Sequence, residues 1–184
     1  GMMFVRGNPS DFDQWAQRGC TGWDYQSVLP AFKAMESFEG GSDDFRGASG
    51  GQRVSMPRMS SPIVEKFIQA AIACGHPYNP DYNGGSQDGV SRVQASQRFG
   101  RRYSASSAFL KPAMSRRNLE VRTQCQVEKI IFEGKRAVGV VYKRGGERLT
   151  ARCAKEVVLS AGAIGSPKIL MHSGIGPSEM LRQY

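Results

Sequence analysis

The sequence predicts a mixed α/β fold, and three observations lead to this class. Strand-like segments joined by glycine turns follow one another between residues 127 and 153, which is typical of a β-meander. An apolar run at residues 157–159 then leads through small residues into a helix-like segment. Before both, segments with helical periodicity and favourable caps occupy much of the first 75 residues.

Each early helix is predicted to begin directly after a residue that favours the N-cap position: Asn8, Asp24 and Ser61. We expect the second helix to run over residues 25–37 and the third to end at Gly75. Aromatic side chains in and between the first two helices are expected to form a packing cluster, with a substrate-binding aromatic box as the alternative: Phe12, Trp15, Trp23, Tyr25 and Phe32.

The segments between these helices and the meander are shorter and less regular. Residues 39–52 are rich in glycine, serine and aspartate, which predicts a mobile loop of the kind that often serves as a lid. We expect strands over residues 52–56, 89–97 and 119–123. A short helix is predicted to open at Ser104 or Ser106.

The last part of the chain is predicted to be a strand, a small-residue turn and a helix. The strand is residues 157–159, the turn is Ala161–Gly162–Ala163, and Ser166 caps a helix that begins at Pro167. In open α/β sheets, ligands bind where a strand ends and a helix begins. A purely structural β–turn–α unit is the alternative.

Composition excludes several classes of protein. The 184 residues are 40% hydrophobic and 22% charged, which indicates a globular chain without a membrane-spanning run. Four scattered cysteines and two histidines predict neither a structural zinc site nor a disulfide framework, so a reducing compartment is expected. The net charge of +9 is dispersed, which favours a solvated surface over nucleic-acid binding.

Several motifs together resemble one family. Residues 162–176 (GAIGSPKILMHSGIG) resemble the second signature of the glucose–methanol–choline (GMC) oxidoreductases, and residues 1–8 with 11–15 resemble the segment after the first signature. Further matches follow in the same order along the whole chain, in the segments 23–25, 29–32, 45–47, 81–84, 87–89, 101–104, 118–119 and 131–140. The branch it resembles is that of choline dehydrogenase-like flavoproteins.

The resemblance implies FAD as cofactor and assigns candidate contacts to it. Val127 matches the position whose backbone contacts the FAD adenine, and Ala161, Gly162 and Ala163 match the turn that passes close to the cofactor. Gly1 and Met2 match the segment beside the flavin ring. The alternatives are an ordinary strand residue at Val127, helix–sheet packing at the small triplet and a cloning remnant at Gly1.

The resemblance also implies an architecture and a function. We expect a partial FAD-binding, Rossmann-like domain with the meander, interleaved with part of an antiparallel-sheet substrate domain. Residues 1–49 would be a leading and lid-like connecting region, residues 50–115 part of the substrate domain, and residues 116–184 part of the FAD domain. The strand at residues 157–159 would be the last Rossmann strand.

The parent protein would oxidise a primary alcohol, choline-like or other, by hydride transfer to flavin. The 184 residues contain no G-x-G-x-x-G turn, and neither His76 nor His172 lies in the context of the family's catalytic pair. We therefore expect an internal fragment with no catalytic or metal-binding residue of its own, inactive when isolated. The alternatives are a non-catalytic chain without FAD and a basic polyanion-binding module. The expected partner is a small-molecule alcohol, without nucleic acid. The expected location is cytoplasmic, with membrane association of the parent protein and its oligomeric state left open.

Overall fold

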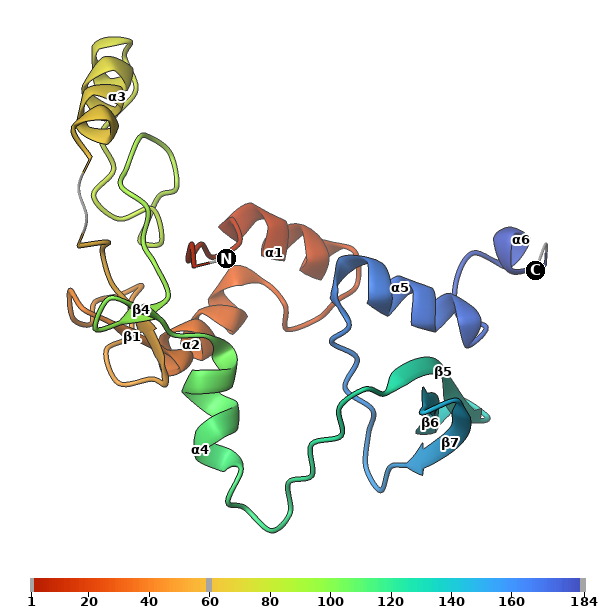
Figure 1. Ribbon diagram of the computed structural model, residues 1–184. Helices are drawn as coiled ribbons and strands as arrows, with labels where there is room; N and C mark the ends of the chain where they lie inside the picture. Colours follow the sequence, from red (N-terminus) through yellow and green to blue (C-terminus); the bar gives the residue numbers. More distant parts are fainter. Residues whose placement is uncertain (1, 59–60, 183–184) are drawn as a thin grey trace. The chain divides into compact units, whose positions relative to one another are not determined.

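The computed structural model describes residues 2–58 and 61–182, which form two compact units, Gly1–Leu119 (unit 1) and Glu120–Tyr184 (unit 2) (Figure 1). Both units combine helix with small sheets, so the predicted mixed class is confirmed. The division lies near the expected boundary at residue 115, whereas the one expected at residue 49 falls inside unit 1. The functional assignment of these segments stays a prediction. Among the described residues, no helix combines the length and the apolarity that crossing a bilayer requires.

The predicted helix starts in unit 1 are confirmed, and two of them have the expected caps. Helix α1 (Pro9–Gln17) begins after Asn8, whose Oδ1 accepts the Ser10 N–H at 3.0 Å, and α2 (Tyr25–Met35) begins after Asp24, whose carboxylate caps it. Helix α3 spans Pro62–Ala73. Helix α2 ends two residues earlier than predicted, because Glu36–Phe38 forms strand β1, parallel to β2 (Gln52–Val54).

Several predicted extended segments of unit 1 differ from the structure. Residues 89–97 form only isolated bridges before β3 (Gln97–Arg98), which pairs with β4 (Arg101–Arg102). The predicted strand at residues 119–123 is wrong, because no described strand pairs with this exposed segment. The short helix after Ser104 is a π-helical turn η1 (Ser106–Leu110) that continues into α4 (Lys111–Ala113).

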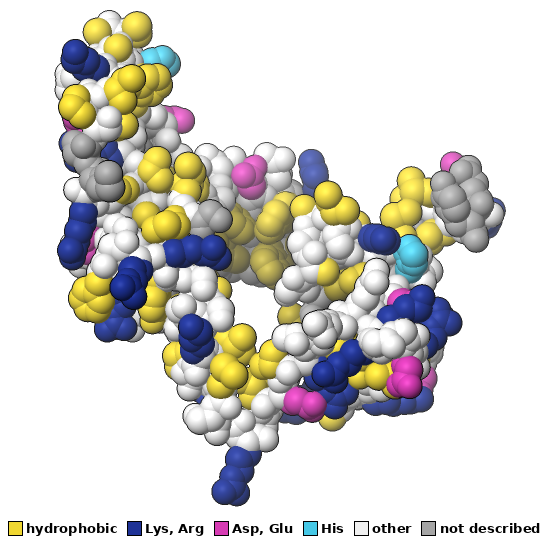
Figure 2. Space-filling view, viewed as in Figure 1, with side chains coloured by type: hydrophobic (Ala, Val, Ile, Leu, Met, Phe, Trp, Pro, Cys, Tyr) yellow, Lys and Arg dark blue, Asp and Glu magenta, His cyan; other side chains and the backbone are white. Residues whose placement is uncertain are grey.

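Helix α3 exposes most of the apolar face that its sequence pattern predicts. Ile68 is buried, but the side chains of Ile63 and Phe67 are more than two-thirds exposed, and Figure 2 shows hydrophobic side chains at this surface. The periodicity correctly predicts the helix. It does not predict burial, because Ile63 and Phe67 on this face stay open to solvent in the described structure.

The meander in unit 2 is confirmed. Strands β5 (Gln126–Glu133), β6 (Arg136–Arg144) and β7 (Glu147–Arg152) are antiparallel in the order β5-β6-β7. Ile130, Val138 and Tyr142 are the buried hydrophobic residues of this unit, as period-2 alternation requires. Helices α5 (Gly162–His172) and α6 (Ser178–Leu181) follow.

The predicted last Rossmann strand is wrong as a strand. Residues 157–159 pair with no described strand, and the Val158 side chain is 78% exposed. An apolar run becomes a parallel strand only where neighbouring strands satisfy its backbone groups. Helix α5 also begins at Gly162 rather than at Pro167, which lies inside it. Ser166 does not cap α5 as predicted; its hydroxyl accepts the Ala161 N–H at 3.0 Å.

Candidate functional site

In unit 2, α5 packs against β5, so Val127 on β5 lies close to the helix that carries the second-signature residues. The Ser173 hydroxyl accepts the Ile130 N–H at 2.8 Å and donates to the Ile169 carbonyl at 2.6 Å, which ties the end of α5 to the strand. A hollow of about 540 Å³ lies between the two elements, with half-buried Val127 on one wall and residues from Gly165 to His172 on the other.

The predicted small-residue turn lies at the N-terminal end of the same helix. Ala161, Gly162 and Ala163 are exposed, and α5 has no side-chain cap. Gly162 has φ +83°, in the left-handed region that favours glycine, and an added Cβ would meet only open space. Because α5 has no side-chain cap, the N–H groups of its first turn are available to an external acceptor.

The hollow carries excess positive charge. Glu128 on its wall is paired with Lys143 at 2.9 Å and Arg148 at 2.6 Å, and these hydrogen bonds hold the pKa of its carboxyl below the usual range. Lys129 and Lys168 also line the hollow and form no ion pair with any described residue. The wall therefore suits an anionic group better than a neutral one.

The other predicted cofactor segment lies in unit 1. The Met2 carbonyl accepts the Ser96 N–H at 2.7 Å, and Met3 forms an antiparallel bridge with Ala95. Met2 is half-buried. Gly1, predicted with it, lies outside the described residues. The structure therefore brings Val127 together with α5 and places Met2 in the other unit.

Unit 1 contains a larger apolar hollow that sequence reasoning missed. It measures about 1020 Å³, and its lining includes Arg6, Phe12, Phe32, Tyr103 and Phe109. Phe12 packs edge-on against Phe32 with ring centroids 5.5 Å apart, so the predicted packing cluster exists and also forms part of this wall. The aromatic spacing could have indicated the cluster but not the hollow, because residues from 96 to 109 complete it.

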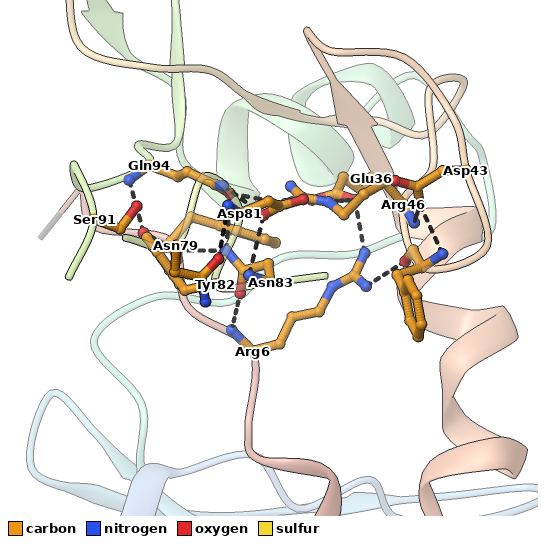
Figure 3. A network of polar contacts seen from close by, with 12 residues as sticks. Arg6, Glu36, Asp43, Arg46, Asn79, Asp81, Tyr82, Asn83, Ser91 and Gln94 are labelled. Carbon is orange, nitrogen blue, oxygen red and sulfur yellow. Dashed lines mark hydrogen bonds and ion pairs between the residues drawn. The ribbon is translucent and has the colours of Figure 1, made fainter. Parts of the chain in front are cut away.

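A buried polar network organises the interior of unit 1 (Figure 3). The Arg46 side chain is wholly buried and donates to both oxygens of Glu36 at 2.5 and 3.0 Å, to Asp81 at 2.6 Å and to Gln94 at 2.9 Å. Arg6 adds a second ion pair with Glu36 at 2.7 Å, and burial lowers the pKa of its guanidinium. The glycine-rich loop that was predicted as a lid is thus anchored to the interior through Arg46.

Known proteins resemble the chain over its whole length. A choline dehydrogenase described as oxygen-dependent, from Brucella ovis, is 42% identical over 184 residues, which is all of this chain and 33% of that protein. Pyridoxine 4-oxidase from Mesorbium loti has the same fold with a TM-score of 0.87 and 33% identity, over 98% of this chain and 36% of the oxidase.

An FAD-dependent oxidoreductase from Chaetomium thermophilum gives a TM-score of 0.88 at 33% identity, over 99% of this chain and 34% of its own length. The chain thus spans about a third of the relatives it matches. The sequence model of the GMC oxidoreductases matches residues 1–181. The chain therefore belongs to the GMC oxidoreductase family.

Proposed function

We propose that this chain is part of an FAD-dependent oxidoreductase that oxidises a primary alcohol, choline-like or other. The observation that carries the proposal is the 42% identity with choline dehydrogenase over all 184 residues. The alcohol itself stays open, because the oxidase with a similar fold is named for pyridoxine.

The residues present fit FAD. Gly162 presents a helix start without a side chain in the way, and the first turn of α5, which has no side-chain cap, can offer its amides to an anionic group. Val127 lies on the strand beside α5. We propose that Val127, Ala161, Gly162 and Ala163, together with Gly1 and Met2, contribute contacts to the cofactor.

FAD, when bound, would supply the acceptor for a hydride from the alcohol carbon. The residues of this chain would bind and orient the cofactor, and the unit 1 hollow would keep water from an apolar part of the site. We propose that no catalytic base comes from these 184 residues, and that the isolated chain is inactive. A cytoplasmic location is proposed for the whole protein.

Anaerobic titration of the whole protein with primary alcohols tests the proposal. Choline, pyridoxine and an aromatic alcohol should be compared, and at least one should bleach the visible flavin absorption in proportion to the alcohol added. A protein that retains flavin but is bleached by no alcohol would contradict the alcohol chemistry. A protein that never binds flavin would contradict the cofactor assignment.

A further inference from the structure

The backbone of residues 4–6 is held mainly by side chains of the loop from Asn79 to Gln94, rather than by a strand. The Phe4 N–H donates to the Gln94 carbonyl at 2.9 Å, which is one rung of an antiparallel pair. The Tyr82 hydroxyl takes the place of the second rung. It accepts the Gln94 N–H at 2.7 Å and donates to the Phe4 carbonyl at 2.9 Å.

Asn83 and Gln87 complete this arrangement. Asn83 is buried, and its Oδ1 accepts the Arg6 N–H at 2.7 Å, while its Nδ2 donates to the Phe4 carbonyl at 3.1 Å and to Gln94 Oε1 at 2.9 Å. Gln87 Nε2 donates to the Arg6 carbonyl at 2.8 Å. Both backbone groups of Phe4 and of Arg6 therefore have partners from one loop.

The same short segment forms a wall of the apolar hollow in unit 1. Phe4, Val5, Arg6 and Gly7 all line it, together with aromatic residues such as Phe109. Two positions before Phe4 lies Met2, which the proposed function places at the cofactor. The segment is thus held by the loop through its backbone polar groups and also faces the hollow, so a change in the loop should change the shape of the hollow.

We propose that Tyr82 and Asn83 are positioning residues that fix the register and conformation of residues 2–7 and thereby the wall of the apolar hollow. As far as Met2 is concerned, the inference rests on the proposed function. Directional side-chain bonds suit this task, because a slipped register would leave the buried Asn83 amide without its partners. Burial raises the pKa of the Tyr82 hydroxyl, which keeps the donor protonated.

Hydrogen exchange of the 184-residue chain tests the positioning directly. Tyr82→Phe removes both bonds of the hydroxyl, and we expect the amides of residues 4–6 to exchange about tenfold faster while residues 126–152 are unchanged. Tyr78→Phe is the matched control, because Tyr78 lies in the same region with a half-exposed ring. Gln87→Ala provides a milder variant with one bond lost, should Tyr82→Phe unfold unit 1.

Equal exchange at residues 4–6 in Tyr82→Phe and Tyr78→Phe would overturn the inference. In the flavin-bound whole protein, Tyr82→Phe should shift the flavin spectrum and slow alcohol-dependent bleaching at least threefold at a temperature where the variant is still folded. If Tyr82→Phe speeds hydrogen exchange at residues 4–6 but leaves the flavin spectrum and the bleaching rate unchanged, the loop has only a structural role. That result would contradict a positioning role for Tyr82. If the wild-type protein binds no flavin, the proposed function fails, while the exchange result still decides how residues 4–6 are held.

Discussion

The interiors of the two units differ, because unit 1 buries polar and charged side chains beside its apolar ones, whereas the buried side chains of the described part of unit 2 are apolar or aromatic. In unit 1 the most completely buried side chains include Arg46, Gln94 and Glu36, which are joined by ion pairs and amide bonds. In unit 2 the buried side chains are Ile130, Val138 and Tyr142, on one face of the antiparallel sheet. A buried ion pair adds little net stability compared with apolar packing, but removing one partner is costly. We infer that directional hydrogen bonds and ion pairs determine the conformation of unit 1, whereas burial of apolar side chains determines that of unit 2.

The largest effect expected from this difference is that of Arg46→Met. The substitution removes the buried cation that Glu36 shares with half-buried Asp81 and leaves Glu36 with Arg6 alone, and we expect it to lower the free energy of unfolding of unit 1 by about 3–5 kcal/mol. Urea titration followed by tryptophan fluorescence reports on unit 1, because Trp15 and Trp23 both lie there. The control Arg92→Met breaks a half-exposed pair with Glu65 and should cost much less, because solvent screens this pair. If Arg46→Met and Arg92→Met lower the free energy of unfolding equally, the buried polar network does not determine the conformation of unit 1.

The same contrast explains what the sequence could predict. Strands β5, β6 and β7 follow from alternation and glycine turns, and the starts of α1 and α2 follow from Asn8 and Asp24, because both signals are local. The buried network joins residues that are 10 to 77 positions apart, and no periodicity marks such pairs. Glu36 therefore fits the pattern of a helix end, and Arg46 that of a mobile loop.

The candidate site was predictable to the same extent. The local patterns correctly predicted that Val127 lies on a strand and that a helix follows residue 161, but not that this helix begins at Gly162, and a contact of these residues with the cofactor stays a prediction. The strand predicted at residues 157–159 depends on partners that the described residues do not provide, so local hydrophobicity could not decide it. The unit 1 hollow is assembled from segments about a hundred residues apart, which explains why it was missed.

Two glycines allow a matched test of independence between the units. An added Cβ at Gly47 would lie 1.8 Å from the Lys33 carbonyl oxygen, and one at Gly139 would lie 2.4 Å from that of Ala151. Backbone atoms cannot easily move aside, so Gly47→Ala and Gly139→Ala should each cost about 1–3 kcal/mol. We expect hydrogen exchange to quicken only in unit 1 for the first and only in unit 2 for the second. If either variant speeds hydrogen exchange in both units, the two units do not unfold independently.

A smaller effect is expected from trimming the apolar interior of unit 2. Ile130→Val removes one buried methyl group and should cost about 0.5–1.5 kcal/mol, measured by hydrogen exchange of β5 and β6. Val158→Ala removes two methyl groups from an exposed side chain and should stay within about 0.5 kcal/mol of the wild type. A greater cost at Val158 would mean that residues 157–159 are buried after all.

The smallest effect is a pH dependence of the meander. Hydrogen bonds from Lys143 and Arg148 lower the pKa of Glu128 from its ordinary value of 4.5, so its contribution to stability is complete above that value. The contribution is lost as the pH falls through the lowered pKa. In Glu128→Gln, the stability of unit 2 should therefore fall less steeply as the pH is lowered from neutral to acid. Circular dichroism measures this stability. An identical acid limb in the variant would show that the pairs are too exposed to matter.

The central claim is that the start of α5 contacts the cofactor, and one pair of glycines tests it. Gly162 and Gly174 lie at opposite ends of α5, have φ of +83° and +81°, and both face open space, so valine strains each equally. We expect the whole protein to lose most of its flavin through gel filtration when it carries Gly162→Val, and to keep it when it carries Gly174→Val. Equal retention, or equal loss, in the two variants would contradict a cofactor contact at Gly162.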